Sequence, residues 1–277
     1  MYSFKYSVII PFRDSIEQLS QAINSIPDRD DIQIIAVDNS KVLYSKEIYP
    51  VLTNANLVVA SSKYGAGAGT ARNEGLKCAQ GEWLLFLDAD DYFVPNAFDA
   101  FDTYVNSKFD IVFFKADSIN LTTGMQSHRH EGINQHIDDY LSNKSEDNLR
   151  YRFGNPVCKM IKHNLISNYN IKFEEVKYAN DVMFSTISGH NANTISADPT
   201  IVYMITEAAA GGSLTTDTSS DNNFIRFQVA VRRYKYMKSI GRPDVKPKFL
   251  SYILYATVRF GIKETWKYLK YYFQNIS

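Results

Sequence analysis

The chain has 277 residues, of which 45% are hydrophobic and 22% charged, so it is long enough to bury a sizeable core. It has no apolar run of about 18 residues, which predicts no transmembrane helix. Cys78 and Cys158 form neither a metal-binding spacing nor a disulfide framework, and residues 1–6 lack the apolar core of a signal peptide. We therefore expect a cytoplasmic protein with one large domain or two unequal ones.

Charge is distributed unevenly although the formal net charge is zero. From Arg226 to the end there are 12 Lys+Arg and 2 Asp+Glu, or +10, which leaves −10 for residues 1–225. Aromatic residues also gather in this last part of the chain. A basic, aromatic segment predicts an anionic partner, either a substrate or an anionic membrane surface, and the equal alternative is that its apolar face only packs on the core. We expect no nucleic-acid partner.

The first sixty residues predict alternating strands and helices. Residues 6–12 and 32–37 are apolar enough to be buried strands, and 57–60 is a third. Between the first two, Asp14 or Ser15 is suited to cap an amphipathic helix. This alternation is typical of a parallel, doubly wound sheet.

A glycine-rich stretch, residues 65–75, follows the third strand and leads into a predicted helix at 68–79. Glycines at a helix N-terminus can cradle a phosphate. The stretch also imitates a dinucleotide-binding fingerprint, but Thr70 stands where the third glycine belongs, and the motif follows the third strand instead of the first. Arg72, on the first turns of this helix, is either in a surface ion pair or directed at a diphosphate.

Three carboxylates, Asp88, Asp90 and Asp91, follow the apolar run 83–87. Residues two apart on an extended chain share a face, so Asp88 and Asp90 could together hold Mg²⁺ or Mn²⁺ with a substrate diphosphate. The alternative is a polar turn in which Asp91 caps the next helix. Asp38 ends the second strand and should lie at the same sheet edge.

The second half of the chain gives weaker patterns. A helix over 96–105, a strand over 109–114, a polar hairpin or loop over 121–131 and a late strand over 194–205 are expected. His128 and His130 could form a ligand pair, but a solvated loop is favoured because no third ligand has clear spacing. Residues 208–218 predict a loop, and helices are expected over 224–240 and 248–273.

Several separated motifs resemble those of family-2 glycosyltransferases of the GT-A fold, over about residues 5–205. The resemblance is to the bacterial subset that builds capsule, lipopolysaccharide or other surface glycans. The matching residues are Pro11, Val37-Asp38-Asn39-Ser40, Ala71-Arg72-Asn73-Glu74-Gly75, Gly81-Glu82, Leu87-Asp88-Ala89-Asp90-Asp91, Pro95, Cys158-Lys159-Met160-Ile161, Ile171-Lys172-Phe173 and Asn180-Asp181-Val182-Met183-Phe184.

The resemblance implies a role for each matching residue. Asp90 would be the principal metal ligand, supported by Asp88, and Asp181 would be the general base. An inverting transfer needs such a carboxylate opposite the leaving diphosphate. Asp38 would bind the base of the nucleotide sugar and Arg72 its base or phosphate region. The remaining expected contacts to the nucleotide sugar are Pro11, Phe12, Asn39 and Ala89.

Two departures from the family pattern stand out. Many relatives carry Asp-Asp-Gly-Ser after the second strand, where this chain has Asp38-Asn39-Ser40. Many also carry Glu-Asp at the position of the general base, where this chain has Asn180-Asp181. Asn180 puts the orientation of the acceptor in doubt. Residues 212–215 match a segment that borders the active site in relatives, although a plain linker explains them equally well.

The sequence thus predicts a GT-A domain over 1–220, with a mostly parallel sheet flanked by helices, and a basic aromatic helical segment over 221–277. The expected activity is metal-dependent transfer of a sugar, by family frequency from a UDP-sugar, to a glycan or lipid-linked acceptor. Two alternatives remain. A sugar nucleotidyltransferase would need a glycine-rich basic loop after the first strand, where this chain has Pro11-Phe12-Arg13-Asp14. An inactive module that only binds nucleotide sugar or scaffolds a complex would not need Asp88, Asp90 and Asp181, which are all present.

Overall fold

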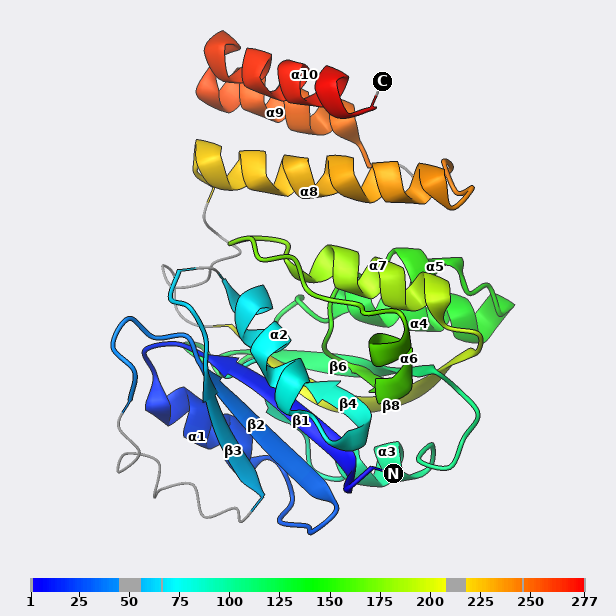
Figure 1. The fold of residues 1–277 in the computed structure, drawn as a ribbon. Coiled ribbons are helices and arrows are strands. Elements are labelled where there is room, and N and C mark those ends of the chain that lie inside the picture. Colours follow the sequence, from blue (N-terminus) through cyan, green and yellow to red (C-terminus); the bar gives the residue numbers. More distant parts are fainter. Residues whose placement is uncertain (1, 45–55, 66, 208–217, 246, 277) are drawn as a thin grey trace.

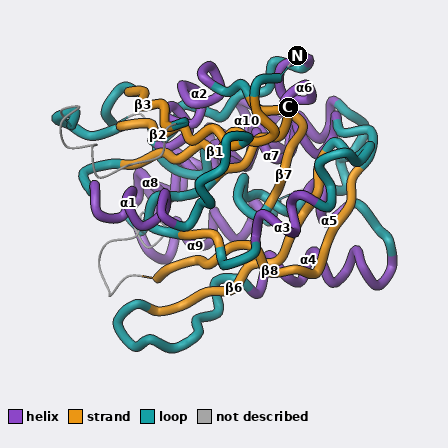
Figure 2. Tube along the Cα trace, turned by 90° about the horizontal axis from the view of Figure 1, so that it is seen from below, coloured by secondary structure: helices purple, strands orange, loops and turns teal. Residues whose placement is uncertain are grey.

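The computed structural model describes residues 2–44, 56–65, 67–207, 218–245 and 247–276. Its centre is an eight-stranded sheet. From one edge to the other the strands are β3 (Leu57–Ser61), β2 (Ile32–Asp38), β1 (Phe4–Phe12), β4 (Gly81–Phe86), β7 (Lys159–Lys162), β6 (Ile111–Asn120), β8 (Ile195–Glu207) and β5 (Tyr92–Phe93). Figure 2 labels all of these strands except β4 and β5.

Strand directions explain where a site can form. β1 runs parallel to both β2 and β4, and β2 runs parallel to β3, so these four strands end at one edge. β7 is antiparallel to its neighbours β4 and β6, whereas β6 and β8 are parallel. The predicted α/β fold with a mostly parallel sheet is confirmed. The sequence patterns did not predict the short antiparallel strands β5 and β7 or the three helices between residues 131 and 168.

Seven helices accompany the sheet in the described part of the first 207 residues. Ser15 caps the first of them, its hydroxyl accepting from the Gln18 backbone N–H at 3.3 Å. The predicted helix over 96–105 is shorter than expected. The seven are α1 (Ile16–Asn24), α2 (Ala68–Cys78), α3 (Ala97–Asp102), α4 (Glu131–Asn143), α5 (Asp147–Tyr151), α6 (His163–Asn168) and α7 (Asp181–Asn191).

Three further helices follow: α8 (Ser220–Ser239), α9 (Phe249–Phe260) and α10 (Ile262–Ile276). The single helix expected over 248–273 is therefore wrong. It breaks at Gly261, whose φ of +86° is a conformation that glycine adopts without strain. Figure 1 shows α8 between the sheet-containing body and the α9–α10 pair. Among the described residues, no helix is both long and apolar enough to cross a membrane.

Three apolar clusters are found among the described residues. The largest draws on buried residues between Tyr6 and Ile205. A small one, formed by Tyr151, Met237 and Val245, joins α5 to α8 and the segment that follows it. A separate cluster joins Phe227, Val231, Ala256 and Tyr268 of the last three helices. The proposed boundary between residues 220 and 221 stays a prediction.

Candidate active site

The carboxyl ends of β1 and β2 hold four of the predicted residues. Asp38 is buried, and its carboxylate accepts backbone N–H groups of Ser40 at 2.8 Å and Tyr44 at 2.9 Å. Asn39 is also buried and its amide donates to the Ser62 hydroxyl at 2.8 Å, joining the ends of β2 and β3. Pro11 and Phe12 end β1 beside Val37 and Asp38. These residues are therefore gathered at one edge, with Asp38 and Asn39 already engaged in shaping the loops.

Asp88, Ala89 and Asp90 lie just beyond the end of β4, at the same edge. The Asp91 N–H donates to the Asp88 carbonyl at 3.0 Å, so the carboxylates sit on a tight turn. Asp90 is in part exposed to solvent, but protein atoms displace water from its carboxylate. This loss of hydration, and next the negative charge of Asp88, raise the pKa of Asp90. The negative charges of Asp88 and Asp90 repel each other, and a bound cation would relieve this repulsion.

Asp91 has a structural role that the sequence did not indicate. It is buried, and it accepts the Tyr203 hydroxyl at 2.9 Å and the Thr206 backbone N–H at 2.7 Å. Burial raises its pKa well above the usual value. The alternative in which Asp91 caps the next helix is wrong, since β5 follows and Asn96 is the cap residue of α3. Asp91 instead attaches the acidic turn to β8.

Arg72 of α2 connects the acidic turn to the region of the predicted base. It is buried, and its guanidinium donates to Asp88 at 2.6 Å and to the Asn180 side chain at 3.0 Å. The guanidinium also lies over the Phe173 ring, 5.4 Å from its centroid. Its Nε is buried with no hydrogen-bond partner in the described part of the chain. The surface ion pair considered from sequence is thus replaced by a buried bridge between two predicted site residues.

The glycines that precede α2 make room for protein backbone. A Cβ on Gly69 would lie 2.4 Å from the Glu174 carbonyl oxygen, and one on Gly67 would lie 2.6 Å from that of Val176. Gly67 also has a φ of +87°. These glycines therefore let α2 approach the loop before Asp181. This close packing explains their presence without the phosphate cradle that the sequence suggested.

Asp181 is the first residue of α7 and is partly buried. Loss of hydration raises the pKa of Asp181, while the nearby positive charge of Arg72 opposes the rise. Asn180 occupies the cap position, so Asp181 is not the helix cap that the sequence left open. A carboxylate with a raised pKa binds a proton more readily, as a general base must.

Lys159, at the start of β7, is a buried cation near Asp181 that motif reading did not assign a role. Its ammonium donates to the backbone carbonyl of Phe153 at 2.9 Å and lies 4.5 Å from the centroid of the Phe153 ring. Burial lowers its pKa to about 7, an effect that the charge of Asp181 opposes. Its position in the matched Cys158-Lys159 motif was the available signal.

The predicted loop over 121–131 contains one more cation of interest. Arg129 lies close enough to lower the pKa of Asp90 and donates to the Thr206 carbonyl at 3.4 Å. Nothing in the sequence pattern singled it out. His128 is exposed and contacts Glu131 at 2.6 Å, whereas His130 contacts the Ser118 hydroxyl at 2.7 Å. The two histidines thus have different partners.

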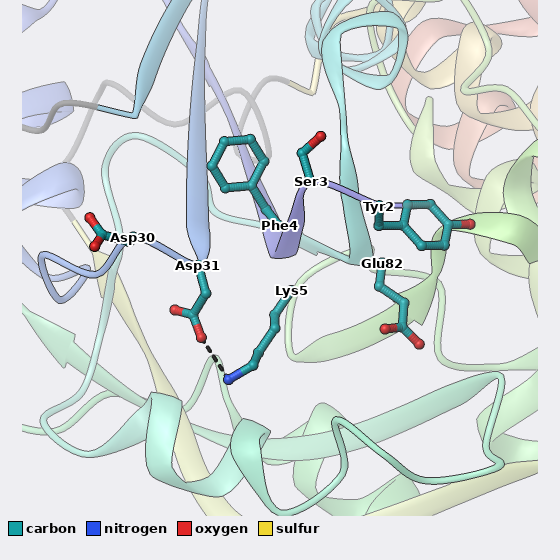
Figure 3. Close-up of a pocket in the computed structure, with 7 residues that line it drawn as sticks. All are labelled: Tyr2, Ser3, Phe4, Lys5, Asp30, Asp31 and Glu82. Carbon is teal, nitrogen blue, oxygen red and sulfur yellow. Dashed lines mark ion pairs between the residues drawn. The ribbon is translucent and has the colours of Figure 1, made fainter.

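A cavity of about 650 Å³ lies at the other end of the parallel strands, away from the acidic turn (Figure 3). Residues 2–5, 30–31 and Glu82 line it, at the amino ends of β1, β2 and β4. Within it Lys5 pairs with Asp31 at 2.8 Å, and Glu82 pairs with Lys162. Its charged groups are largely paired, and parallel sheets bind ligands at their carboxyl ends, so the aspartate edge is the better candidate site.

The residues present fit a divalent cation of the Mg²⁺ or Mn²⁺ type. Asp88 and Asp90 offer hard carboxylate oxygens, whereas Asp91 is occupied by β8. Within the described ranges, no group of three or more His, Cys, Asp or Glu side chains could hold a metal. A site with two protein carboxylates matches the habit of Mg²⁺ to keep water and substrate phosphates as its other ligands. Residues 212–215 lie outside the described residues.

The structure thus combines an α/β sheet with an acidic turn at the carboxyl ends of its parallel strands, and comparison with known proteins gives the family. The profile of Glycosyl transferase family 2 matches residues 7–169, more than half of the chain. The chain therefore belongs to glycosyl transferase family 2, as the motifs indicated.

Among characterised relatives, the chain is similar to the poly(ribitol-phosphate) β-N-acetylglucosaminyltransferase TarS of Staphylococcus aureus. The two are 25% identical over 229 residues, which cover 79% of this chain and 38% of TarS. It is 26% identical over 212 residues to a poly(ribitol-phosphate) β-glucosyltransferase of Bacillus spizizenii, covering 73% of this chain and 32% of the relative. The chain thus spans about a third of the length of these relatives.

Solved structures confirm the GT-A fold. The S. aureus TarS fragment 1–349, crystallised with UDP-GlcNAc, superposes with a TM-score of 0.74 at 20% identity, covering 99% of this chain and 82% of the fragment. The mannosyltransferase PcManGT of Pyrobaculum calidifontis, crystallised with GDP-Man and Mn²⁺, gives 0.57 at 14% identity, covering 100% of this chain and 77% of the other.

Proposed function

We propose that this chain is a metal-dependent, inverting glycosyltransferase that moves a sugar from a nucleotide sugar to a glycan or lipid-linked acceptor in bacterial surface polysaccharide synthesis. The observation that carries the proposal is the bridge formed by Arg72. One buried guanidinium joins Asp88, beside the predicted metal ligand, to Asn180, beside the predicted base. Donor-binding and proton-accepting carboxylates are thereby held at one sheet edge.

The donor would lie across the ends of β1, β2 and β4. Asp38, Asn39, Pro11 and Phe12 would contact its nucleoside part, and Ala89 would offer backbone beside the diphosphate. The Nε of Arg72 is buried without a hydrogen-bond partner among the described residues, which supports an anion nearby, since buried polar atoms seldom lack a partner. UDP-sugar is the donor that we favour, because the similar TarS fragment was crystallised with UDP-GlcNAc.

Asp90 and Asp88 would hold the Mg²⁺ or Mn²⁺. When bound, the cation would stabilise the negative charge of the departing nucleoside diphosphate. The protein supplies the remaining positive charge through Arg72, which pairs with Asp88, and Arg129, which lies near Asp90.

Asp181 would remove the proton from the acceptor hydroxyl. The acceptor oxygen attacks the anomeric carbon, the bond from that carbon to the diphosphate oxygen breaks, and the hydroxyl proton passes to Asp181. The raised pKa of Asp181 makes it a stronger base than an exposed aspartate. The positive charge of Arg72 opposes this rise in the pKa of Asp181.

We further propose a two-part chain, with catalysis in residues 1–220 and a basic helical segment over 221–277. The enzyme would work in the cytoplasm, peripheral to the inner face of the membrane. Poly(ribitol phosphate) and undecaprenol-diphosphate sugars are the acceptors to test, since they appear in the names of relatives.

The test is a donor and acceptor screen that measures release of nucleoside diphosphate. The chain would be incubated with UDP-GlcNAc, UDP-Glc or GDP-Man, with Mn²⁺, Mg²⁺ or a chelator. We expect acceptor-dependent release of UDP that the chelator stops. Tight donor binding without any turnover across the acceptor panel would favour the inactive binding module instead.

A further inference from the structure

The last two helices carry an exposed apolar face. It consists of Leu250, Leu254 and Val258 on α9 with Ile262 and Trp266 on α10, and we call these five residues the apolar face. Val258 is 87% exposed and Trp266 67%. Residues four apart share one side of a helix, so each helix contributes one continuous stripe. Large apolar side chains grouped in this way on a surface mark an interaction site.

The opposite sides of α9 and α10 form the small core with α8. The Phe227 ring of α8 lies 5.7 Å from that of Tyr252 and 4.8 Å from that of Tyr268, centroid to centroid. Ala256 and Tyr268 are fully buried there. The apolar face therefore lies on the sides of α9 and α10 that point away from α8, and in Figure 1 this pair is the outermost layer of the protein.

Basic side chains surround the apolar face. Lys248, Arg259, Lys263 and Lys270 are all exposed, and none of them forms an ion pair with any residue that the structure describes. Residues 248–276 contain five Lys+Arg and one acidic residue, Glu264, for a net charge of +4. A second copy of the chain on this face would bring two such positive surfaces together, which is unfavourable. An anionic surface would complement it.

We infer that the apolar face is a docking surface for an anionic lipid bilayer. The apolar side chains would enter the boundary between headgroups and acyl chains, and the flanking Lys and Arg would contact acidic headgroups. This inference deepens the proposed function and rests on it, because an enzyme with a lipid-linked acceptor must work at a membrane.

α8, which packs against α9 and α10, also contacts the loop that leads to the candidate base Asp181. Arg232 of α8 forms an ion pair with Glu174 at 2.6 Å, in the loop before Asp181. Arg226, also on α8, lies over the ring of Tyr178 in the same loop, 5.0 Å from its centroid. Docking through α9 and α10 would thus hold this loop at a fixed place relative to the lipid surface.

The test uses the full chain and vesicles, without donor or acceptor. Vesicles of phosphatidylglycerol and phosphatidylcholine in equal parts are compared with vesicles of phosphatidylcholine alone. We expect co-sedimentation with the anionic vesicles at low salt. The bound fraction should fall at least about tenfold between about 0.01 and 1 M salt, as the screening length shrinks from about 30 to 3 Å.

Trp266 provides a second readout. The chain has two tryptophans, and Trp83 is fully buried in the sheet, so a blue shift of emission on vesicle addition would report Trp266. The double variant Leu254→Glu/Val258→Glu should lose both binding and the shift. Tyr169→Glu, at a residue 54% exposed elsewhere on the surface, is the control and should bind as the native chain does.

Three results would overturn the inference. The first is that the folded protein does not bind anionic vesicles at low salt, and the second is that it binds equally well to vesicles without acidic lipid. The third is a dimer, seen by sedimentation velocity, that the Leu254→Glu/Val258→Glu variant no longer forms. Release of UDP with a soluble acceptor is measured on the same preparations. Lost vesicle binding with UDP release intact would refute the docking surface alone, and lost release with vesicle binding intact would refute the proposed function alone.

Discussion

Arg72 on α2 and Asp88 beyond β4 form an ion pair, with 2.6 Å between Nη2 and Oδ1. The side chain of Arg72 is 7% exposed and that of Asp88 38%, so the pair lies at the boundary between the interior and the candidate donor site. The second Nη group donates to Asn180. The guanidinium thus donates hydrogen bonds to two separate segments, the turn after β4 and the start of α7, which a single ammonium cannot do in the same geometry.

We predict that Arg72→Lys raises the KM for the donor by about tenfold or more, because one ammonium cannot replace a planar fork of donors. Steady-state kinetics with varied UDP-sugar would measure it. Lys77→Met is the matched control, since Lys77 lies on the same helix but is exposed and contacts Glu74. An unchanged KM in Arg72→Lys would remove Arg72 from the donor site.

Asp90→Ala should abolish metal-dependent donor binding, because Asp90 would be the principal metal ligand. Calorimetric titration of UDP with and without Mn²⁺ would show the loss. Asp91→Asn separates this role from a structural one. Asp91 accepts from Tyr203 and Thr206, so its change should lower the free energy of unfolding by about 1–3 kcal/mol and keep the Mn²⁺ dependence. The same UDP affinity with Mn²⁺ in Asp90→Ala and the native chain would contradict the assignment.

The Arg232–Glu174 ion pair should position the loop that leads to Asp181. The Glu174 N–H donates to the Asn180 carbonyl at 3.1 Å, so a shift at Glu174 would be passed to the start of α7. We expect Arg232→Met to lower kcat several-fold with little change in donor KM. Lys235→Met, at an exposed position of the same helix, is the control. Equal kcat values for both variants would show that the pair only joins the two parts.

The sequence predicted the elements whose signal is local. Apolar runs located β1, β2, β3 and β4, and acidic residues at strand ends located Asp38, Asp88 and Asp90 at one edge. β7 has only two apolar residues, Met160 and Ile161, between two lysines, so it gives no apolar run to recognise, and its pairing partners are far away in the chain. The break at Gly261 was readable, since glycine is a common helix terminator, but a continuous apolar face hid it.

Contacts between distant segments could not be read from the sequence. Asp91 and its partner Tyr203 are 112 residues apart, and Arg72 and Asn180 are 108 apart. No spacing rule connects such pairs, because they depend on how strands are ordered in the sheet. The close approach of Gly69 to Glu174 has the same origin, and for that reason a packing glycine resembled a phosphate-binding one.

Lys159 predicts a pH dependence of stability. Its pKa in the folded protein is about 7, against an ordinary value of 10.5. Between these two pH values the unfolded chain binds more protons, so this residue makes the free energy of unfolding rise with pH, and the rise is complete near 10.5. Lys159→Met should weaken the rise. Urea unfolding from about pH 7 to 9 compares the slopes, and equal slopes would mean that Lys159 does not titrate in this range.

Asp181→Asn tests the chemical step. An amide of the same size cannot accept the proton of the acceptor, so kcat should fall by about 10²-fold or more. Donor affinity should stay near normal, because Asp181 is not expected to contact the nucleotide. Asp99→Asn is the control, since Asp99 is likewise acidic and in the first turn of its helix, but exposed.

The pH profile sharpens this last test. A general base works when unprotonated, so kcat should rise with pH through the pKa of Asp181, which loss of hydration places above the ordinary 3.8. In Asp181→Asn the residual rate should lose this acidic limb, whereas Asp99→Asn should keep it. Loss of donor affinity with kcat and its acidic limb intact would move Asp181 from proton transfer to donor binding.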